Sequence, residues 1–258
     1  MSKFASLSFS GKFVKYYETF FADKNFDGMG KFFVNLFQKE CRGRKILDFG
    51  CGTGIFCENF AKNGYDIVGV DCSEDMISYA KENHCGGGGK NITYFCEDIR
   101  TFKMPLVFDG VCALSHVVCY QVSNDDLLQV FLNAYSHLKE GGIFIFDFYH
   151  QAGIFTHNLE ARIKRVQHNE ITITRFSEAK FDLMENCIDC SYKYLIEDRD
   201  NKPLFLESND KMRFFSLKEL EYYLKNIGFK AIEFFDLSDF REVKLTSQSR
   251  NGYCLARK

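Results

Sequence analysis

Apolar residues near the start of the chain recur at the spacing of helices. Over residues 12–40, side chains such as Phe13, Tyr17 and Phe20, and later Phe33 and Phe37, fall three or four positions apart. Positions with this spacing share one face of a helix. The pattern predicts two N-terminal helices, interrupted around Asp27-Gly28.

From Lys45 onward, short apolar runs alternate with amphipathic segments. The runs typical of strands are Lys45–Phe49, Tyr65–Val70, Ile92–Cys96, Phe108–Leu114, Ile143–Phe148, Lys230–Asp236 and Gly252–Arg257. The segments typical of helices are Ile55–Asn63, Glu74–Asn83, Asn124–Lys139 and Ser216–Ile227. Alternation of strands with helices indicates a parallel sheet with helices on both faces.

A different pattern fills residues 160–212. Strand-like runs at Glu170–Phe176, Ile188–Ile196 and Leu204–Leu206 follow one another without a helical segment between them. Consecutive strands of this kind pair as an antiparallel unit.

The whole chain is long enough for one α/β domain with an elaboration, and too short for two ordinary catalytic domains. We expect a helical cap at 1–44, a cofactor-binding core at 45–150, an antiparallel β insertion at 151–212 and the end of the core at 213–258.

Composition narrows the function. The 33 basic and 35 acidic residues give a formal charge of −2, which disfavours nucleic acid as a partner. We expect no secretory signal and no membrane segment, and hence a cytoplasmic protein whose 11 cysteines are reduced. Cys187 and Cys190 lack a second pair at zinc-ribbon spacing, so no metal is predicted. The run Gly86–Gly89 indicates a surface connection between a helix and a strand.

The most informative segment runs from Asp48 to Gly54, where a strand leads into a glycine-rich turn and then a helix. Glycines let the backbone approach a ligand closely, and a helix N-terminus presents free N–H groups to an anion. Asp71 ends the next strand about 20 residues later, where a carboxylate can bind the hydroxyls of an adenosine ribose. The spacing Gly-x-Gly-x-Gly fits the Gly-x-Gly-x-x-Gly rule of nicotinamide enzymes poorly.

The following strand ends in Glu97-Asp98-Ile99. A carboxylate next to an aliphatic side chain suits the amino group and ring of an adenine.

These features, together with Leu138-Lys139-Glu140-Gly141-Gly142 before a strand, resemble the class I S-adenosylmethionine-dependent methyltransferases in order and spacing. The resemblance covers residues 45–150 and implies a Rossmann-like seven-stranded sheet whose last strand is antiparallel. It implies S-adenosylmethionine as cofactor. The residues that it assigns to the cofactor are Tyr16, Asp48, Gly50, Cys51, Gly52, Gly54, Asp71, Cys72, Met76, Asp98, Ile99 and Leu114.

The acceptor side is less defined. Tyr16-Tyr17 and the segment Ser115–Gln121 resemble the small-molecule branch of the family, including sugar-amine N-methyltransferases. His116 follows the fourth strand at the edge where open α/β sheets place ligands, and its imidazole titrates near neutral pH. His116, Tyr17 and Tyr120 are therefore the candidate catalytic residues, and Asp147, Tyr149 and His150 are expected at the same edge.

Two other functions stay open at this point. One is a NAD(P)-dependent Rossmann oxidoreductase, and the other is a non-catalytic, cofactor-binding interaction protein that uses residues 160–212 as a partner surface. The favoured function is methyl transfer to a small molecule, a sugar or an amine, on nitrogen or oxygen. We further expect the insertion to cover the acceptor, and we regard a homodimer as compatible with the sequence.

Overall fold

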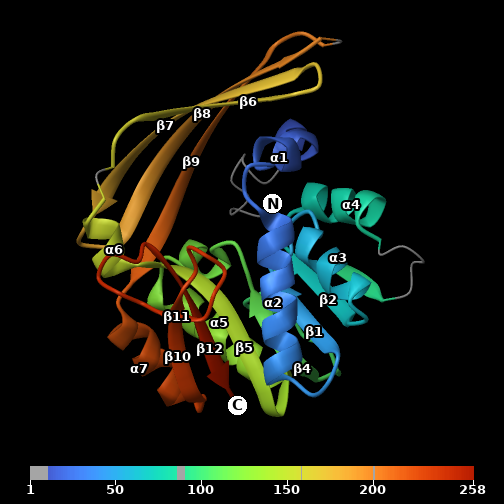
Figure 1. Cartoon of the computed structure of the whole chain (residues 1–258), viewed down its shortest axis with the longest axis vertical. Helices are drawn as coiled ribbons and strands as arrows, with labels where there is room; N and C mark the ends of the chain where they lie inside the picture. Colours follow the sequence, from blue (N-terminus) through green and yellow to red (C-terminus); the bar gives the residue numbers. More distant parts are fainter. Residues whose placement is uncertain (1–10, 86–90, 158, 200) are drawn as a thin grey trace.

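The computed structural model describes residues 11–85, 91–157, 159–199 and 201–258 (Figure 1). Two expectations lie outside the described residues. They are the surface connection at Gly86–Gly89 and the absence of a signal segment in the first ten residues.

One sheet of twelve strands organises the described part of the chain. Its core strands are β1 (Lys45–Phe49), β2 (Asp66–Asp71), β3 (Ile92–Cys96), β4 (Phe108–Ala113), β5 (Leu138–His150), β10 (Lys230–Asp236), β11 (Val243–Lys244) and β12 (Asn251–Arg257). Strands β3, β2, β1, β4 and β5 are parallel in that order, and β12 pairs antiparallel with both β5 and β10.

The insertion contributes four antiparallel strands. They are β6 (Arg162–His168), β7 (Ile171–Asp182), β8 (Cys187–Asp198) and β9 (Leu204–Phe215). Strand β5 runs past its pairing with β4 and joins β9 through Tyr149 and His150. The expectation of seven strands is therefore too low, because the long β5 links the insertion into the same sheet.

Helices cover both faces of the core sheet, as expected. They are α2 (Phe26–Glu40), α3 (Ile55–Lys62), α4 (Glu74–Asn83), α5 (Asn124–His137) and α7 (Leu217–Ile227), with the short α6 (Gln151–Phe155) after β5. Successive strand residues point to opposite faces: Leu47 packs in one cluster with Val130 of α5, whereas Ile46 packs in another with Phe60 of α3.

Helix α1 (Val14–Phe20), preceded by a 3-10 turn at Gly11–Phe13, lies between the insertion and the core (Figure 1). Its Phe13 and Phe20 pack with Tyr194 of β8 in a third apolar cluster. The cap thus contacts the concave side of the insertion strands β6–β9. It places Tyr17 near the junction of the insertion and the core sheet.

Two helix boundaries differ from expectation by two residues or more. The break between the N-terminal helices falls at residues 21–25 and not at Asp27-Gly28. Asn25 ends the break because its side chain accepts the backbone N–H of Gly28 at 2.8 Å, which is the usual role of an asparagine N-cap. Helix α5 stops at His137 instead of Lys139, because Leu138 already pairs with Phe108 of β4.

Among the described residues, no helix is long and apolar enough to cross a membrane.

Candidate active site

The glycine-rich turn between β1 and α3 has the left-handed backbone that its sequence predicts. Gly50, Gly52 and Gly54 have φ of 71°, 52° and 84°. A Cβ at Gly50 would lie 2.4 Å from Val117, and one at Gly54 would lie 2.3 Å from the Tyr94 hydroxyl. At Gly52 it would meet nothing within 4 Å. The two outer glycines are therefore needed for packing, and the central one borders open space that a ligand can occupy.

Asp71 lies directly beside this turn. Its Oδ2 accepts the backbone N–H of Gly52 at 2.9 Å, and its Oδ1 accepts that of Ser73 at 2.9 Å. Burial raises the pKa of Asp71. Burial also raises the pKa of Tyr17, and the negative charge of Asp71 adds to that effect. The carboxylate expected at the ribose is thus fixed to the glycine turn, with a tyrosine of the cap close enough to sense its charge.

Asp48 lies on the core side of the turn. It is 1% exposed, and the thiols of Cys57 and Cys112 each donate to its carboxylate at 3.3 Å. Burial raises its pKa to about 7. Cys51, in the turn itself, is buried. A buried carboxyl that titrates near neutrality is suited to pair with a cationic ligand group such as an ammonium.

Asp98 has a partner that the sequence did not reveal. Both of its carboxylate oxygens accept from Arg100 Nε, at 2.9 and 3.0 Å. Arg100 Nη1 also donates to Asp126 Oδ1 at 2.6 Å. This pairing lowers the pKa of Asp98. A carboxylate held in this way stays ionised and keeps a fixed orientation at the end of β3.

The other residues assigned to the cofactor are divided between surface and interior. Cys72 is exposed after β2. The apolar members of the set are buried: Met76, Ile99 and Leu114. Tyr16 is placed differently from expectation: its ring packs in the cluster between α1 and the insertion, and its hydroxyl lies 3.2 Å from Asp198 Oδ2. The structure therefore directs Tyr16 toward β8, since its helix turns that face to the insertion, and leaves Tyr17 to face the site.

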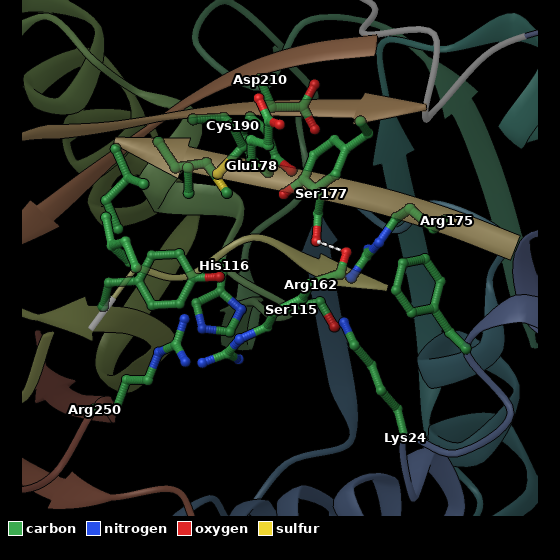
Figure 2. Close-up of a pocket in the computed structure, with 18 of the residues that line it drawn as sticks. Lys24, Ser115, His116, Arg162, Arg175, Ser177, Glu178, Cys190, Asp210 and Arg250 are labelled. Atoms are coloured by element: carbon green, nitrogen blue, oxygen red, sulfur yellow. Dashed lines mark hydrogen bonds between the residues drawn. The ribbon is translucent and has the colours of Figure 1, made fainter. Parts of the chain in front are cut away.

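A cavity of about 270 Å³ lies between the insertion strands and the carboxyl edge of the core sheet (Figure 2). Tyr17, His116 and Tyr120, the three candidate catalytic residues, all line it. Tyr149 lines it too, as expected for the end of β5, whereas His150 is buried with Nδ1 at 2.9 Å from the Ser249 carbonyl. Residues far apart in the sequence thus meet in one place.

His116 is held by contacts with three residues. It adopts a left-handed φ of 66°, and its backbone N–H donates to Asp147 Oδ1 at 2.9 Å. Its Nδ1 lies 3.4 Å from Asp147 Oδ2, and its Nε2 lies 3.3 Å from Asn251 Oδ1. The ring packs on Tyr149 with centroids 4.2 Å apart. Burial lowers the pKa of His116 below its ordinary value of 6.5, and the cations Lys24 and Arg250 contribute.

Asp147 is the buried partner of this histidine. It is 1% exposed, and among the described residues its Oδ2 has no hydrogen-bond partner. Leaving a buried carboxylate oxygen without a donor is costly, so the nearby His116 Nδ1 is the natural group to satisfy it. Nε2 also faces an oxygen, Asn251 Oδ1, so the tautomer of the neutral ring depends on which of the two oxygens receives its single N–H.

Four cations line the same cavity. Lys24 comes from the loop before α2, Arg162 and Arg175 come from the insertion, and Arg250 precedes β12. Within the described part of the chain, none of the four lies within 4.0 Å of a carboxylate oxygen, and the buried Arg175 Nε lacks a hydrogen-bond partner. Sequence reasoning missed all four, because they are scattered over 226 positions with no shared motif. Only the fold brings them together.

The comparisons with known proteins agree with this geometry. Residues 46–142 match a family model described as a methyltransferase domain. A protein of Bacillus subtilis (strain 168) named as a methyltransferase, YqeM, is 27% identical over 218 residues, covering 83% of this chain and 84% of its own.

Solved structures share the fold over almost the whole chain. An S-adenosylmethionine-dependent methyltransferase from Clostridium acetobutylicum ATCC 824 superposes with a TM-score of 0.81 at 22% identity, covering 95% of this chain and 97% of its own. The sugar N-methyltransferase KedS8 from Streptoalloteichus sp ATCC 53650 gives 0.79 at 18% identity, covering 100% and 97%. Residues 46–142 are thus a methyltransferase domain, and the fold around them is shared with S-adenosylmethionine-dependent methyltransferases.

Proposed function

We propose that the protein methylates a small acceptor, of the size of a sugar, that carries an amine or hydroxyl and also an anionic group. The observation that carries the proposal is the meeting of Tyr17, His116 and Tyr120 in one cavity with four cations that lack carboxylate partners. The domain match does not favour the nicotinamide oxidoreductase or the non-catalytic interaction protein.

The cofactor supplies a methyl group bonded to a positively charged sulfur. Asp71 would bind the ribose hydroxyls, Asp98 the adenine amine, and the turn around Gly52 the methionyl part. Tyr17 would close this site from the cap, because its hydroxyl lies within the electrostatic reach of Asp71. The chain thereby fixes the donor, and catalysis consists chiefly of holding the acceptor in line with it.

His116 is the group best suited to take a proton from the acceptor. Its lowered pKa keeps the imidazole neutral at pH 7, so one ring nitrogen keeps a free lone pair. A hydroxyl acceptor needs such a base during the attack, whereas an amine needs it only to reach its neutral form. Asp147, whose Oδ2 lies 3.4 Å from Nδ1, would orient the ring.

The cations favour an acidic acceptor. Lys24 and Arg175 raise the electrostatic potential of the cavity, and guanidinium groups bind phosphate or carboxylate oxygens in pairs. Glu178 and the buried Asp210 line another part of the wall and would face an amine or hydroxyl. This mixture suits a polar molecule with separate anionic and neutral or basic groups, such as an acidic derivative of an amino sugar.

The insertion forms the wall of the cavity opposite His116. Arg175 and Glu178 of β7 and Tyr192 of β8 line it, so we propose that residues 160–212 shape the acceptor site.

The direct test is methyl transfer from labelled S-adenosylmethionine to matched pairs of amino sugars with and without a phosphate group. We expect transfer to the phosphorylated members, abolished in His116→Ala. Equal transfer to both members of each pair would refute the anionic subsite. Absence of calorimetric binding of both the cofactor and its demethylated product would refute the function itself.

A further inference from the structure

His84 joins the cap to the cofactor-binding part of the core. It follows α4, and its side chain lies between two carboxylates: Nε2 is 2.7 Å from Glu18 of α1, and Nδ1 is 2.9 Å from Glu58 of α3. It is 9% exposed. One imidazole thus connects three helices that are distant in the sequence.

This geometry requires a proton on the ring. A neutral imidazole carries a single N–H, so it can donate to one carboxylate and must turn a lone pair toward the other. The imidazolium donates to both. Burial on its own lowers the pKa of His84, but the two carboxylates outweigh burial and raise the pKa above its ordinary value of 6.5.

Other groups facing this contact are few among the described residues. From α3, Lys62 lies 3.0 Å from Glu58, and from α4, Tyr79 is bonded to Glu18. From β3, the Tyr94 hydroxyl donates to the backbone carbonyl of His84 at 2.7 Å. Tyrosines and lysine keep their charge states near neutral pH, which leaves His84 as the titrating member.

Helix α1 carries this attachment and a cofactor-facing residue side by side. Glu18 follows Tyr17, whose hydroxyl is influenced by Asp71. The opposite side of α1 is bound to the insertion through Phe13 and Phe20. On the core side, Tyr79 is also bonded to Glu18, and the Gly11 N–H before α1 donates to Asp75 at 2.6 Å. Releasing Glu18 would therefore loosen α1 from the core but not from the insertion.

We propose that protonated His84 is a positioning residue: it clamps helix α1 to α3 and so keeps Tyr17 within electrostatic reach of Asp71, which sets the affinity for the cofactor at the site proposed above. The clamp is complete below pH 6.5 and weakens as the pH rises through the raised pKa of His84. Asp48, whose pKa is about 7, has the opposite effect on cofactor affinity. Its carboxylate becomes ionised as the pH rises and then attracts a cationic ligand group more strongly.

The test is calorimetric binding of S-adenosylhomocysteine, the demethylated cofactor, between about pH 6 and about pH 8.5, where histidine titrates. We expect His84→Gln to bind about tenfold more weakly than the native protein at the acidic end, the value of one charge-assisted contact, and to match it at the alkaline end. His168→Gln, an exposed histidine of β6, should follow the native curve.

Glu18→Gln removes the α1 side of the clamp and leaves His84 and Glu58 in place. It should reproduce the curve of His84→Gln, and it carries the test if His84→Gln does not fold. A second readout is hydrogen exchange of residues 14–20 at about pH 6, which should be faster in both variants than in the native protein. If Glu18→Gln keeps the native dependence of affinity on pH, the proposal is wrong, even where methyl transfer itself is intact.

Discussion

The buried carboxylate of Asp147 contacts His116 twice, through the backbone N–H at 2.9 Å and toward ring Nδ1 at 3.4 Å. The two contacts fix the position of the residue and the orientation of its ring together. A histidine with a left-handed backbone needs such support, since few side chains adopt that conformation without it.

The first prediction concerns this pair. Asp147→Asn keeps an oxygen for the backbone N–H but removes the charge that faces Nδ1. We expect kcat for methyl transfer to fall by about tenfold to a hundredfold, the range for impaired acid–base catalysis, with unchanged cofactor affinity. Steady-state kinetics and calorimetry measure the two quantities. Asp66→Asn, at an exposed position in β2, serves as control. If Asp147→Asn lost cofactor affinity as strongly as kcat, the role of Asp147 would be structural.

The pH profile tests the proposed base. Because the pKa of His116 is lowered, the imidazole is unprotonated at pH 7 and becomes protonated only when the pH falls below 6.5. We expect kcat to decline on the acidic side through that lowered pKa and to stay level above it. His116→Gln should be slow and lack this decline. If kcat of the variant still declined at acidic pH as in the native protein, a group other than His116 would be responsible for the decline.

The cationic wall makes a prediction about binding. Arg175→Gln should raise KM for an anionic acceptor about tenfold, the value of one charged hydrogen bond, while kcat stays within about twofold. Arg165→Gln on neighbouring β6 is the matched control, since Arg165 does not line the cavity. Equal KM values for Arg175→Gln and the native protein would place the anionic group elsewhere.

The glycine turn gives a contrast between two substitutions. Gly52→Ala meets open space, so only its left-handed φ is strained, and we expect a loss of about 1 kcal/mol in the free energy of unfolding. Gly50→Ala also collides with Val117 and should lose about 3 kcal/mol. Urea denaturation measures both. We expect Gly52→Ala nevertheless to bind the cofactor more weakly, because its methyl group occupies the ligand space.

Much of the core could be predicted from the sequence. The bounds of β1, α4 and β3 agree with the predicted ones, because each segment has a clear period and a turn signal beside it. The turn at 50–54 and Asp71 come together as expected, since both follow neighbouring parallel strands. The local sequence pattern is enough to predict a contact where the two segments follow adjacent strands of the sheet.

Other features depended on distant contacts. Strand β6 was missed because its segment Arg162–His168 is polar and mostly exposed, so that only its pairing with β7 makes it a strand. Tyr16 was assigned to the cofactor, but the partner of its hydroxyl is Asp198, 182 positions away. The contact of Asp147 with His116 and the place of Arg175 in the cavity wall likewise arise from packing that no spacing in the sequence records.

Strand β5 connects the two halves of the molecule through its last two residues, Tyr149 and His150, which alone pair with β9. The residues before them in the strand pair with β4 and β12 of the core sheet. In the sheet, the proposed acceptor wall is therefore joined to the methyltransferase domain by one short pairing, so an exchange of the insertion between related chains would leave the other strand pairs of the core intact.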